Sequence, residues 1–410
     1  MALLDSRGPA GASSTLPTLG SKLRHAAAKA FRSNSVELGT MASPPTIATG
    51  TSSLDGTLTQ YRYVLSAANT AKYRLVGGLA QAYSTAYITS TAVSLPSGTG
   101  GNTQGDATHS TWSWAVEFVT DAPTVQLRYL CSSLTYMVEV DDQPVSATGL
   151  AFPATSGTGF TLLTFGTSAI RKIRVEFRQA SAFDSAYVGP TYSLWAPGDE
   201  YNVRAAFVGD SVTAGSAGPT LAHGAWPKIT GKLLGWSDTR QVALGGTGFT
   251  NNASTLNTFG AALRVADTVA HSPDLVVISA SPNDDGASGG TLTAAALSAF
   301  QAYRAALPRV PIIVTGTTAS STGPNATRLA NETAVKAAFD AWADRNSWWI
   351  PVSTDPSGSW DSGTGTTGAT TGTGNRDRFG SDVTHSNDLG NVYLGRRMAT
   401  AIKSLVIPNA

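Results

Sequence analysis

Cysteine is almost absent from this chain. The 410 residues include only Cys131, so no disulfide can form within the chain. Cys131 lies in an apolar run, which favours a buried structural thiol over a reactive one. Charge is also scarce, because 28 Lys and Arg stand against 27 Asp and Glu, for a net charge of +1 and 13% charged residues. No strong electric field therefore favours a nucleic-acid partner.

Long apolar runs are missing as well. No stretch of about 18 consecutive apolar residues occurs, so no membrane-spanning helix is expected. Residues 1–20 contain Asp5, Arg7 and two prolines but no apolar core, so no secretory signal is expected either. Histidine and cysteine are too few for a zinc site, and no phosphate-binding loop is present. We therefore expect neither a metal nor a cofactor.

Composition divides the chain into three regions, predicted to be residues 1–50, 51–198 and 199–410. The first region is basic, with a short helix predicted over Ser21–Arg32 and then a linker rich in Pro, Ser and Thr. This arm is either a flexible tail or an attachment segment that becomes ordered against a partner.

Residues 51–198 have the pattern of an all-β domain. Apolar and polar residues alternate in the runs Trp112–Phe118, Val125–Tyr129 and Ile173–Phe177. Such alternation is typical of strands with one face buried and one face in water. Turns such as Asp141–Pro144 separate the runs, so we predict a β-sandwich or jelly roll. The aromatic residues belong either to its core, which is the commoner case, or to a carbohydrate-binding face.

From residue 199 onward, apolar strands alternate with helical segments. The strands are predicted at Ala205–Val208, Gln241–Leu244, Leu275–Ser279, Ile312–Thr315 and Trp349–Val352. The helices are predicted near Leu221–Trp236, Leu256–Ala270, Leu292–Leu307, Arg328–Arg345 and Asn391–Leu405. This alternation predicts an α/β domain with a flavodoxin-like parallel sheet and helices on both faces. The long Gly/Thr/Ser-rich loop Thr354–Ser381 is expected to be functional or mobile.

Four short motifs follow predicted strands, at the ends where open α/β sheets bind their ligands. The first is Gly209-Asp210-Ser211, which offers Ser211 as a nucleophile at the start of a helix or turn. Free N–H groups at such a position favour a developing anion. A nucleophilic serine also needs a base, a group that orients the base, and donors for an oxyanion.

A base and its orienting group occur together near the C-terminus. Asp382 lies three residues before His385, so its carboxylate can hold the ring while the other ring nitrogen faces Ser211. The rival base is His223, which begins a predicted helix near Ser211. The remaining histidines lie in the basic arm, in a loop of the β region and at the end of a predicted helix: His25, His109 and His271.

Two further motifs offer oxyanion donors. Gly248 lies in the turn Gly245–Thr250, where a glycine lets the backbone aim an N–H at a substrate. Asn283, in Ser281–Asp284, has an amide that can donate to an oxyanion. Each motif taken alone also fits a structural reading, as a plain glycine turn and as an Asx-turn.

Taken together, the four motifs resemble those of the SGNH (GDSL-type) hydrolases, a family of serine esterases and lipases. The resemblance covers about residues 203–405 and includes Gly215 after the serine. Two positions depart from the family pattern, since Ser281 stands where glycine is usual and Ser386 where proline often follows the histidine. Neither change removes a catalytic atom. The β region more loosely resembles jelly-roll domains that precede such domains in some carbohydrate esterases.

The resemblance implies a role for each of five residues. Ser211 would attack the acyl carbon, His385 would be the general base, and Asp382 would orient it. The N–H groups of Ser211 and Gly248 and the amide of Asn283 would form the oxyanion hole.

We therefore predict a serine esterase or deacetylase that acts on short acyl esters, such as acetyl groups on a cell-surface or extracellular glycan. The polar loop Thr354–Ser381 and the lack of a hydrophobic lid favour short acyl groups over long-chain lipids. The alternative is a binding or structural protein with a remnant esterase domain.

The setting suggested by the sequence is a virion, such as a phage tail, or the extracellular space. A basic arm without a signal and a surface rich in Gly, Ser and Thr are similar to those of phage virion proteins. In that case residues 1–45 would contact other virion subunits. The sequence leaves the oligomeric state open, including a homo-oligomer.

Overall fold

The computed structural model describes residues 17–32, 40–62, 72–78, 80–82, 88–90, 113–132, 134–178, 181–198, 200–216, 224–254, 256–320, 323–361 and 378–405. Several predicted features lie outside the described residues: His109, Trp112, His223, residues 1–16 of the basic arm and the middle of the Thr354–Ser381 loop.

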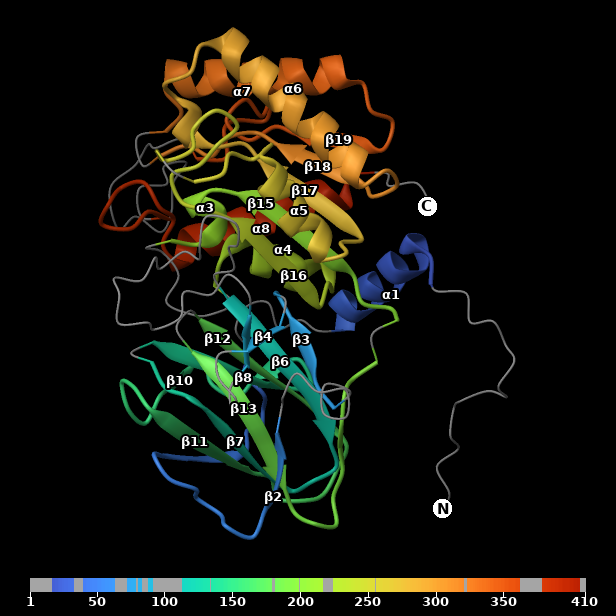
Figure 1. Ribbon diagram of the computed structural model, residues 1–410, viewed down its shortest axis with the longest axis vertical. Coiled ribbons are helices and arrows are strands. Elements are labelled where there is room, and N and C mark those ends of the chain that lie inside the picture. Colours follow the sequence, from blue (N-terminus) through green and yellow to red (C-terminus); the bar gives the residue numbers. More distant parts are fainter. Residues whose placement is uncertain are drawn as a thin grey trace.

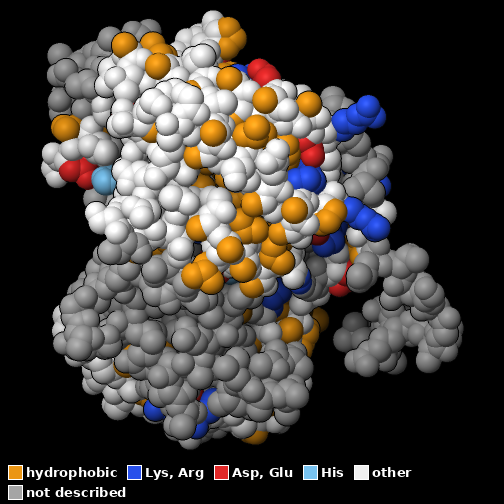
Figure 2. Space-filling model, turned by 45° about the horizontal axis from the view of Figure 1, so that its top comes forward, with side chains coloured by type: hydrophobic (Ala, Val, Ile, Leu, Met, Phe, Trp, Pro, Cys, Tyr) orange, Lys and Arg blue, Asp and Glu red, His pale blue; other side chains and the backbone are white. Residues whose placement is uncertain are grey.

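Within the described part, a β region and an α/β region lie one beside the other (Figure 1). Among the described residues on the face that Figure 2 displays, charged side chains are sparse, as expected. None of the described helices is long and apolar enough to cross a membrane.

The β region contains two antiparallel sheets. The first has the order β1-β11-β7-β13-β5-β4, with β2 paired to β13. Its strands are Thr46–Gly50 (β1), Thr158–Thr164 (β11), Thr124–Leu130 (β7), Ala182–Val188 (β13), Ile88–Ser90 (β5), Ala80–Ala82 (β4) and Thr59–Arg62 (β2). The second has the order β10-β8-β12-β6-β14, with β3 paired to β6 and β9 to β8. Its strands are Leu150–Ala151 (β10), Thr135–Val140 (β8), Arg171–Arg178 (β12), Ser113–Thr120 (β6), Leu194–Trp195 (β14), Arg74–Val76 (β3) and Gln143–Pro144 (β9).

Both sheets contribute to one buried core. It includes Trp114, Phe118 and Phe177 from the second sheet and Leu127 and Tyr129 from the first. Two sheets around one core fit the predicted sandwich, and for these aromatic residues the core interpretation is confirmed. Cys131 is also buried in this core, as predicted, and burial raises the pKa of its thiol.

One expectation about the β strands is wrong. The outer face of β6 and β12 was expected to be in water, yet Glu117 and Glu176 are fully buried. This face packs against the α/β region, where Arg174 of β12 donates to the carbonyl of Ser237 at 3.1 Å. Ion pairs within the interface, such as Arg174–Glu117 at 3.0 Å, offset the cost of burying the charges.

The α/β region is built on a five-stranded parallel sheet of order β16-β15-β17-β18-β19. The strands are Asp238–Ala243 (β16), Arg204–Gly209 (β15), Leu275–Ser279 (β17), Ile312–Thr315 (β18) and Ser347–Ile350 (β19). Numbered in chain order this is 2-1-3-4-5, the order of flavodoxin-like sheets, and ligands bind such sheets where the order reverses. That point lies at the carboxyl end of β15, immediately before Ser211.

Helices cover both faces of the parallel sheet, as predicted. Helices α5 (Ala262–Ala270), α6 (Gly289–Ala306) and α7 (Ala326–Trp342) share a core with one face, and α4 (Trp226–Leu234) and α8 (Asp388–Lys403) with the other. Helix α5 begins only at Ala262, whereas the sequence predicts a start near Leu256. The preceding loop is held by its own hydrogen bonds, such as the one from Phe259 N–H to Gly248 O at 2.9 Å.

Helix α1 (Leu19–Arg32), the described part of the basic arm, packs within the chain. Ala26 is buried against α4, and a Cβ on Gly235 would lie 1.9 Å from the Ala26 carbonyl oxygen. Lys22 pairs with Asp274 of the α/β region at 2.8 Å, and Lys29 pairs with Asp142 of the β region at 3.2 Å. The helix thus contacts both regions, so this segment is not a flexible tail, and its binding to a partner stays a prediction.

Candidate active site

The candidate nucleophile lies on a tight turn between β15 and the short helix α3 (Ser211–Ala214). Asp210 caps the helix, because its Oδ1 accepts the N–H of Val212 at 2.9 Å. The turn needs glycine at position 209, since a Cβ there would lie 2.1 Å from the Thr213 hydroxyl oxygen. Asp210 is buried, and burial raises the pKa of its carboxyl.

His385 joins the two ends of a hydrogen-bonded relay. Its Nε2 lies 2.8 Å from Ser211 Oγ, and its Nδ1 lies 2.6 Å from Asp382 Oδ2. The other carboxylate oxygen, Oδ1, accepts the N–H groups of Thr384 and His385, both at 3.0 Å. Partial burial opposes ionisation, but these hydrogen bonds outweigh it and hold the pKa of Asp382 below its ordinary value. An ionised Asp382 keeps the proton on Nδ1 and leaves Nε2 free to accept the serine proton.

The loop that carries His385 is fastened to the start of α8. Asn387 caps this helix by accepting the N–H of Gly390 at 3.0 Å. The side chain of Asn391 then donates to the Ser386 carbonyl at 2.8 Å and accepts the N–H of Trp226 at 3.0 Å, which links α8 to α4. The side chain of His385 is 20% exposed, so solvent reaches the hydrogen-bonded chain of Ser211, His385 and Asp382.

The other described histidines have different surroundings. His271 is buried and contacts the guanidinium of Arg240, and His25 stacks on Tyr201 with ring centres 5.0 Å apart. Of the histidines in the described ranges, His385 alone contacts Ser211. The rival base His223 lies outside those ranges.

The Asn283 side chain lies next to the nucleophile turn. Its Nδ2 donates to the Thr247 carbonyl at 3.0 Å and lies 3.4 Å from Asp210 Oδ2. The short 3-10 helix η1 (Pro282–Asp284) carries it past the end of β17. The backbone N–H of Ser211 has no hydrogen-bond partner among the described residues, so it is free to donate to a ligand.

Gly248 is placed differently from the expectation. Its N–H donates to the carbonyl of Asn251 at 2.8 Å, so it is already used within the loop. Gly246 comes two residues earlier, has φ +75°, and its N–H has no partner within the described ranges. Sequence spacing cannot distinguish the glycines in the run Gly245–Gly248, and the structure shows that the loop uses the N–H of Gly248 but not that of Gly246 among the described residues.

Gly248 has a structural reason to be glycine. The Asp284 carboxylate accepts the backbone N–H groups of Phe249, Thr250 and Asn251 at 2.9, 2.9 and 3.2 Å. A Cβ on Gly248 would lie 2.4 Å from Asp284 Oδ2. Asp284 therefore organises this loop rather than the chemistry.

Sequence reasoning missed Arg264, which lies beneath the nucleophile turn. This side chain is fully buried, and its Nη2 donates to the carbonyls of Gly209 and Val242 at 2.6 and 2.8 Å. Burial lowers the pKa of the guanidinium to about 10. The only sequence signal was a cation on the apolar face of a predicted helix. Its contacts join the carboxyl ends of β15 and β16, where the site lies.

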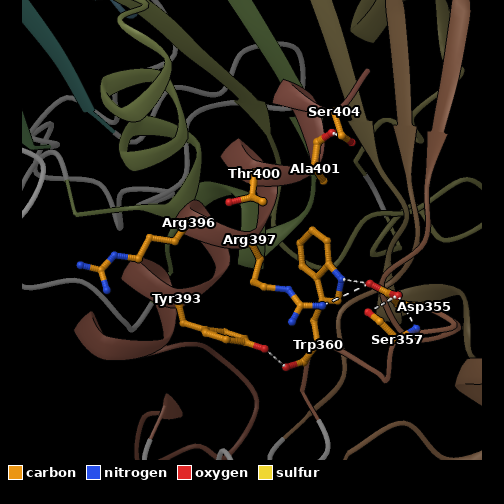
Figure 3. Close-up of a pocket in the computed structure, with 9 residues that line it drawn as sticks. All are labelled: Asp355, Ser357, Trp360, Tyr393, Arg396, Arg397, Thr400, Ala401 and Ser404. Carbon is orange, nitrogen blue, oxygen red and sulfur yellow. Dashed lines mark hydrogen bonds and ion pairs between the residues drawn. The ribbon is translucent and has the colours of Figure 1, made fainter. Parts of the chain in front are cut away.

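A cavity of about 540 Å³ lies along α8 (Figure 3), and Ser211, His385 and Asp382 are not among the residues that line it. Trp360, Tyr393 and Arg397 are among the residues that line it. Arg397 lies over the Trp360 ring at 5.1 Å and pairs with Asp355 at 3.2 Å, while Trp360 Nε1 donates to the same carboxylate at 2.7 Å. These groups satisfy one another, so the cavity offers no convergent set of free polar groups. Within the described ranges, no cluster of His, Cys, Asp and Glu could hold a metal ion.

The fold is similar to that of several solved structures. The salicylyl-acyltransferase SsfX3 from a tetracycline biosynthetic pathway matches with a TM-score of 0.62 and 13% identity, over 86% of this chain and 100% of that chain. A family two carbohydrate esterase from Clostridium thermocellum, solved with cellohexaose, matches with a TM-score of 0.55 and 16% identity, over 80% and 98%. The acetyl xylan esterase Est2A from Butyrivibrio proteoclasticus matches with a TM-score of 0.54 and 12% identity, over 84% and 98%.

These identities are low, so the likeness shows a shared fold. It extends over both the β region and the α/β region, because between 80% and 86% of this chain is covered. No family model matches the chain, and no curated protein matches it significantly. The matched structures give no support to a virion setting, which stays a prediction.

Proposed function

We propose that this chain is a serine esterase that hydrolyses short acyl esters of a glycan through an acyl-serine intermediate. The observation that carries the proposal is the continuous relay from Ser211 Oγ through His385 to Asp382, with distances of 2.8 and 2.6 Å. A nucleophile, a base and a carboxylate in this geometry define a catalytic triad by their roles. The fold shared with carbohydrate esterases supports the assignment.

The first half-reaction acylates the serine. Nε2 of His385 takes the hydroxyl proton as Ser211 Oγ bonds to the ester carbonyl carbon, and the carbonyl oxygen becomes an oxyanion. When this intermediate collapses, the bond to the alcohol oxygen breaks and the His385 imidazolium gives that oxygen its proton. The alcohol leaves, and the acyl group remains on Ser211.

The second half-reaction restores the enzyme. His385 takes a proton from a water molecule, whose oxygen bonds to the acyl carbon. Collapse breaks the bond between that carbon and Ser211 Oγ, and the proton on Nε2 returns to the serine. The products are the free carboxylic acid and the unmodified triad. Throughout both steps the Asp382 carboxylate stabilises the imidazolium.

Three groups near the nucleophile turn are candidate donors to the oxyanion. We assign the hole to the N–H groups of Ser211 and Gly246 and to the Asn283 amide. The two backbone N–H groups have no other partner in the described part of the chain, and Asn283 Nδ2, which already donates to the Thr247 carbonyl at 3.0 Å, would donate its second hydrogen to the oxyanion. Donors fixed in advance stabilise the developing charge without reorganisation.

The substrate class follows from the surroundings of the triad. The partly exposed His385 suits an ester displayed on a large molecule, and the sequence lacks a hydrophobic lid that would receive a long acyl chain. We therefore propose acetyl or similarly short acyl groups on a carbohydrate.

Chromogenic esters of increasing acyl length test this proposal. The wild type should cleave the acetyl ester fastest, and Ser211→Ala should remove that activity. A serine-reactive phosphonate should label the wild type but not the variant. Faster cleavage of long-chain esters would contradict the acyl preference. Failure to cleave any short ester would favour the alternative of a binding protein with a remnant esterase domain.

A further inference from the structure

Ser281 stands at the end of β17, where the resembled family usually has glycine. The side chain is 2% exposed, and its φ of −108° is one that any residue adopts, so the backbone does not require glycine here. A buried hydroxyl is costly unless it is hydrogen-bonded, so its partners indicate what it does.

The Ser281 hydroxyl contacts three separate parts of the site. Its Oγ lies 2.5 Å from Asp210 Oδ2 and 2.8 Å from the Thr247 carbonyl, and it accepts the backbone N–H of Asn283 at 3.0 Å. The hydroxyl has one proton and two acceptors in reach, and its lone pairs take the third contact.

Each of these partners supports one proposed oxyanion donor. Asp210 caps α3 and so fixes the N–H of Ser211. Thr247 directly follows Gly246, and its carbonyl also accepts Asn283 Nδ2 at 3.0 Å. The Asn283 N–H that Ser281 accepts belongs to the residue whose amide would face the oxyanion. The three donors come from the loops after β15, β16 and β17, and this hydroxyl connects all three.

We propose that Ser281 is a positioning residue, whose hydroxyl holds the three oxyanion donors in fixed positions relative to one another. The inference rests on the proposed function, because it assigns Ser281 to the oxyanion hole of that reaction. With alanine or glycine at this position, the hydrogen bond of the single hydroxyl proton, shared between Asp210 and Thr247, and the one accepted from Asn283 N–H would both be lost, and the loops could shift independently. A shift of about 1 Å in such a site costs on the order of 10²-fold in rate.

The test compares Ser281→Ala with a matched control, Ser353→Ala. Ser353 is also a buried serine whose hydroxyl donates to a backbone carbonyl, that of Thr317, but it follows the edge strand β19. With a chromogenic acetyl ester, Ser281→Ala should lower kcat by about 10- to 100-fold with little change in KM. Ser353→Ala should leave kcat within about twofold of the wild type, and both variants should unfold at similar temperatures.

A double-mutant cycle separates positioning from a general loss of structure. If Ser281 acts through the oxyanion donors, Ser281→Ala should cost much less in an Asn283→Ala background than in the wild type. Equal costs in both backgrounds, or a Ser281→Ala variant as active as Ser353→Ala, would overturn the inference while wild-type activity still upholds the proposed function. A wild type no more active than Ser211→Ala would overturn both.

Discussion

His385 Nε2 lies 2.8 Å from Ser211 Oγ, although 174 residues separate the two along the chain. Ser211 follows the strand at which the order of the parallel sheet reverses, and His385 lies in the loop before the last helix. The sheet topology therefore brings nucleophile and base together, and local hydrogen bonds set their orientation.

Asp382→Asn tests the orienting role of the carboxylate. The substitution keeps the size of the side chain but removes the charge that stabilises the imidazolium and selects the Nδ1 tautomer. We expect kcat for an acetyl ester to fall by roughly 10⁴-fold. Because Asp382 is 39% exposed, thermal unfolding should hardly change. Steady-state kinetics would contradict the account if the loss were less than about tenfold.

Asn283→Ala tests the amide as an oxyanion donor. Removal of one such donor should lower kcat by on the order of 10²–10³-fold, while substrate binding changes little. Kinetics at saturating and low substrate separate the two effects. A small loss in kcat would mean that Asn283 only shapes the turn after β17.

Gly248→Ala tests the structural reading of that glycine. The new Cβ would clash with the Asp284 carboxylate, 2.4 Å away, so we expect a loss of about 1–3 kcal/mol in the free energy of unfolding. Denaturant unfolding measures it. Because the clash is with Asp284, the cost should shrink in an Asp284→Ala background. A Gly248→Ala variant as stable as the wild type would contradict this structural reading.

Asp361 predicts a pH dependence of stability. Burial raises the pKa of its carboxyl from 3.8 to about 7, and the nearby cations Arg378 and Arg397 only partly oppose this. Between these two values the folded state keeps the proton that the unfolded state releases, so stability should fall as pH rises through this window. The slope is at most about 1.4 kcal/mol per pH unit.

Asp361→Asn should remove this contribution, because the amide cannot titrate. The difference between wild type and variant cancels the other titrating groups. Denaturant unfolding of both proteins from about pH 4 to about pH 7.5 should show the wild type losing stability relative to the variant. Parallel curves would show that Asp361 is ionised in the folded protein.

Much of the fold could be predicted because strands and helices produce patterns of apolar and polar residues within short stretches of sequence. Alternating residues identified β7 and β12, and apolar runs identified the strands of the parallel sheet. The burial of Glu117 and Glu176 could not be predicted, because nothing in strand periodicity says that the charged face of a strand meets another region of the chain.

The candidate site also contains residues that the sequence predicts and residues whose roles it does not. The order of four motifs identified Ser211, Asp382 and His385, which the structure brings into contact. The choice between Gly246 and Gly248 depends on which N–H the loop already uses, and the role of Ser281 depends on a contact with Asp210. Both are relations in space that sequence spacing does not contain.

The most direct measurement is mass spectrometry of the protein after it has been mixed with an acetyl ester and quenched in acid. The acid quench stops deacylation, so we expect one acetyl group on the peptide that contains Ser211. The same experiment with Ser211→Ala should show neither acetylation nor turnover. Equal turnover by both proteins, or an acetyl group on another residue of an active wild type, would contradict the account.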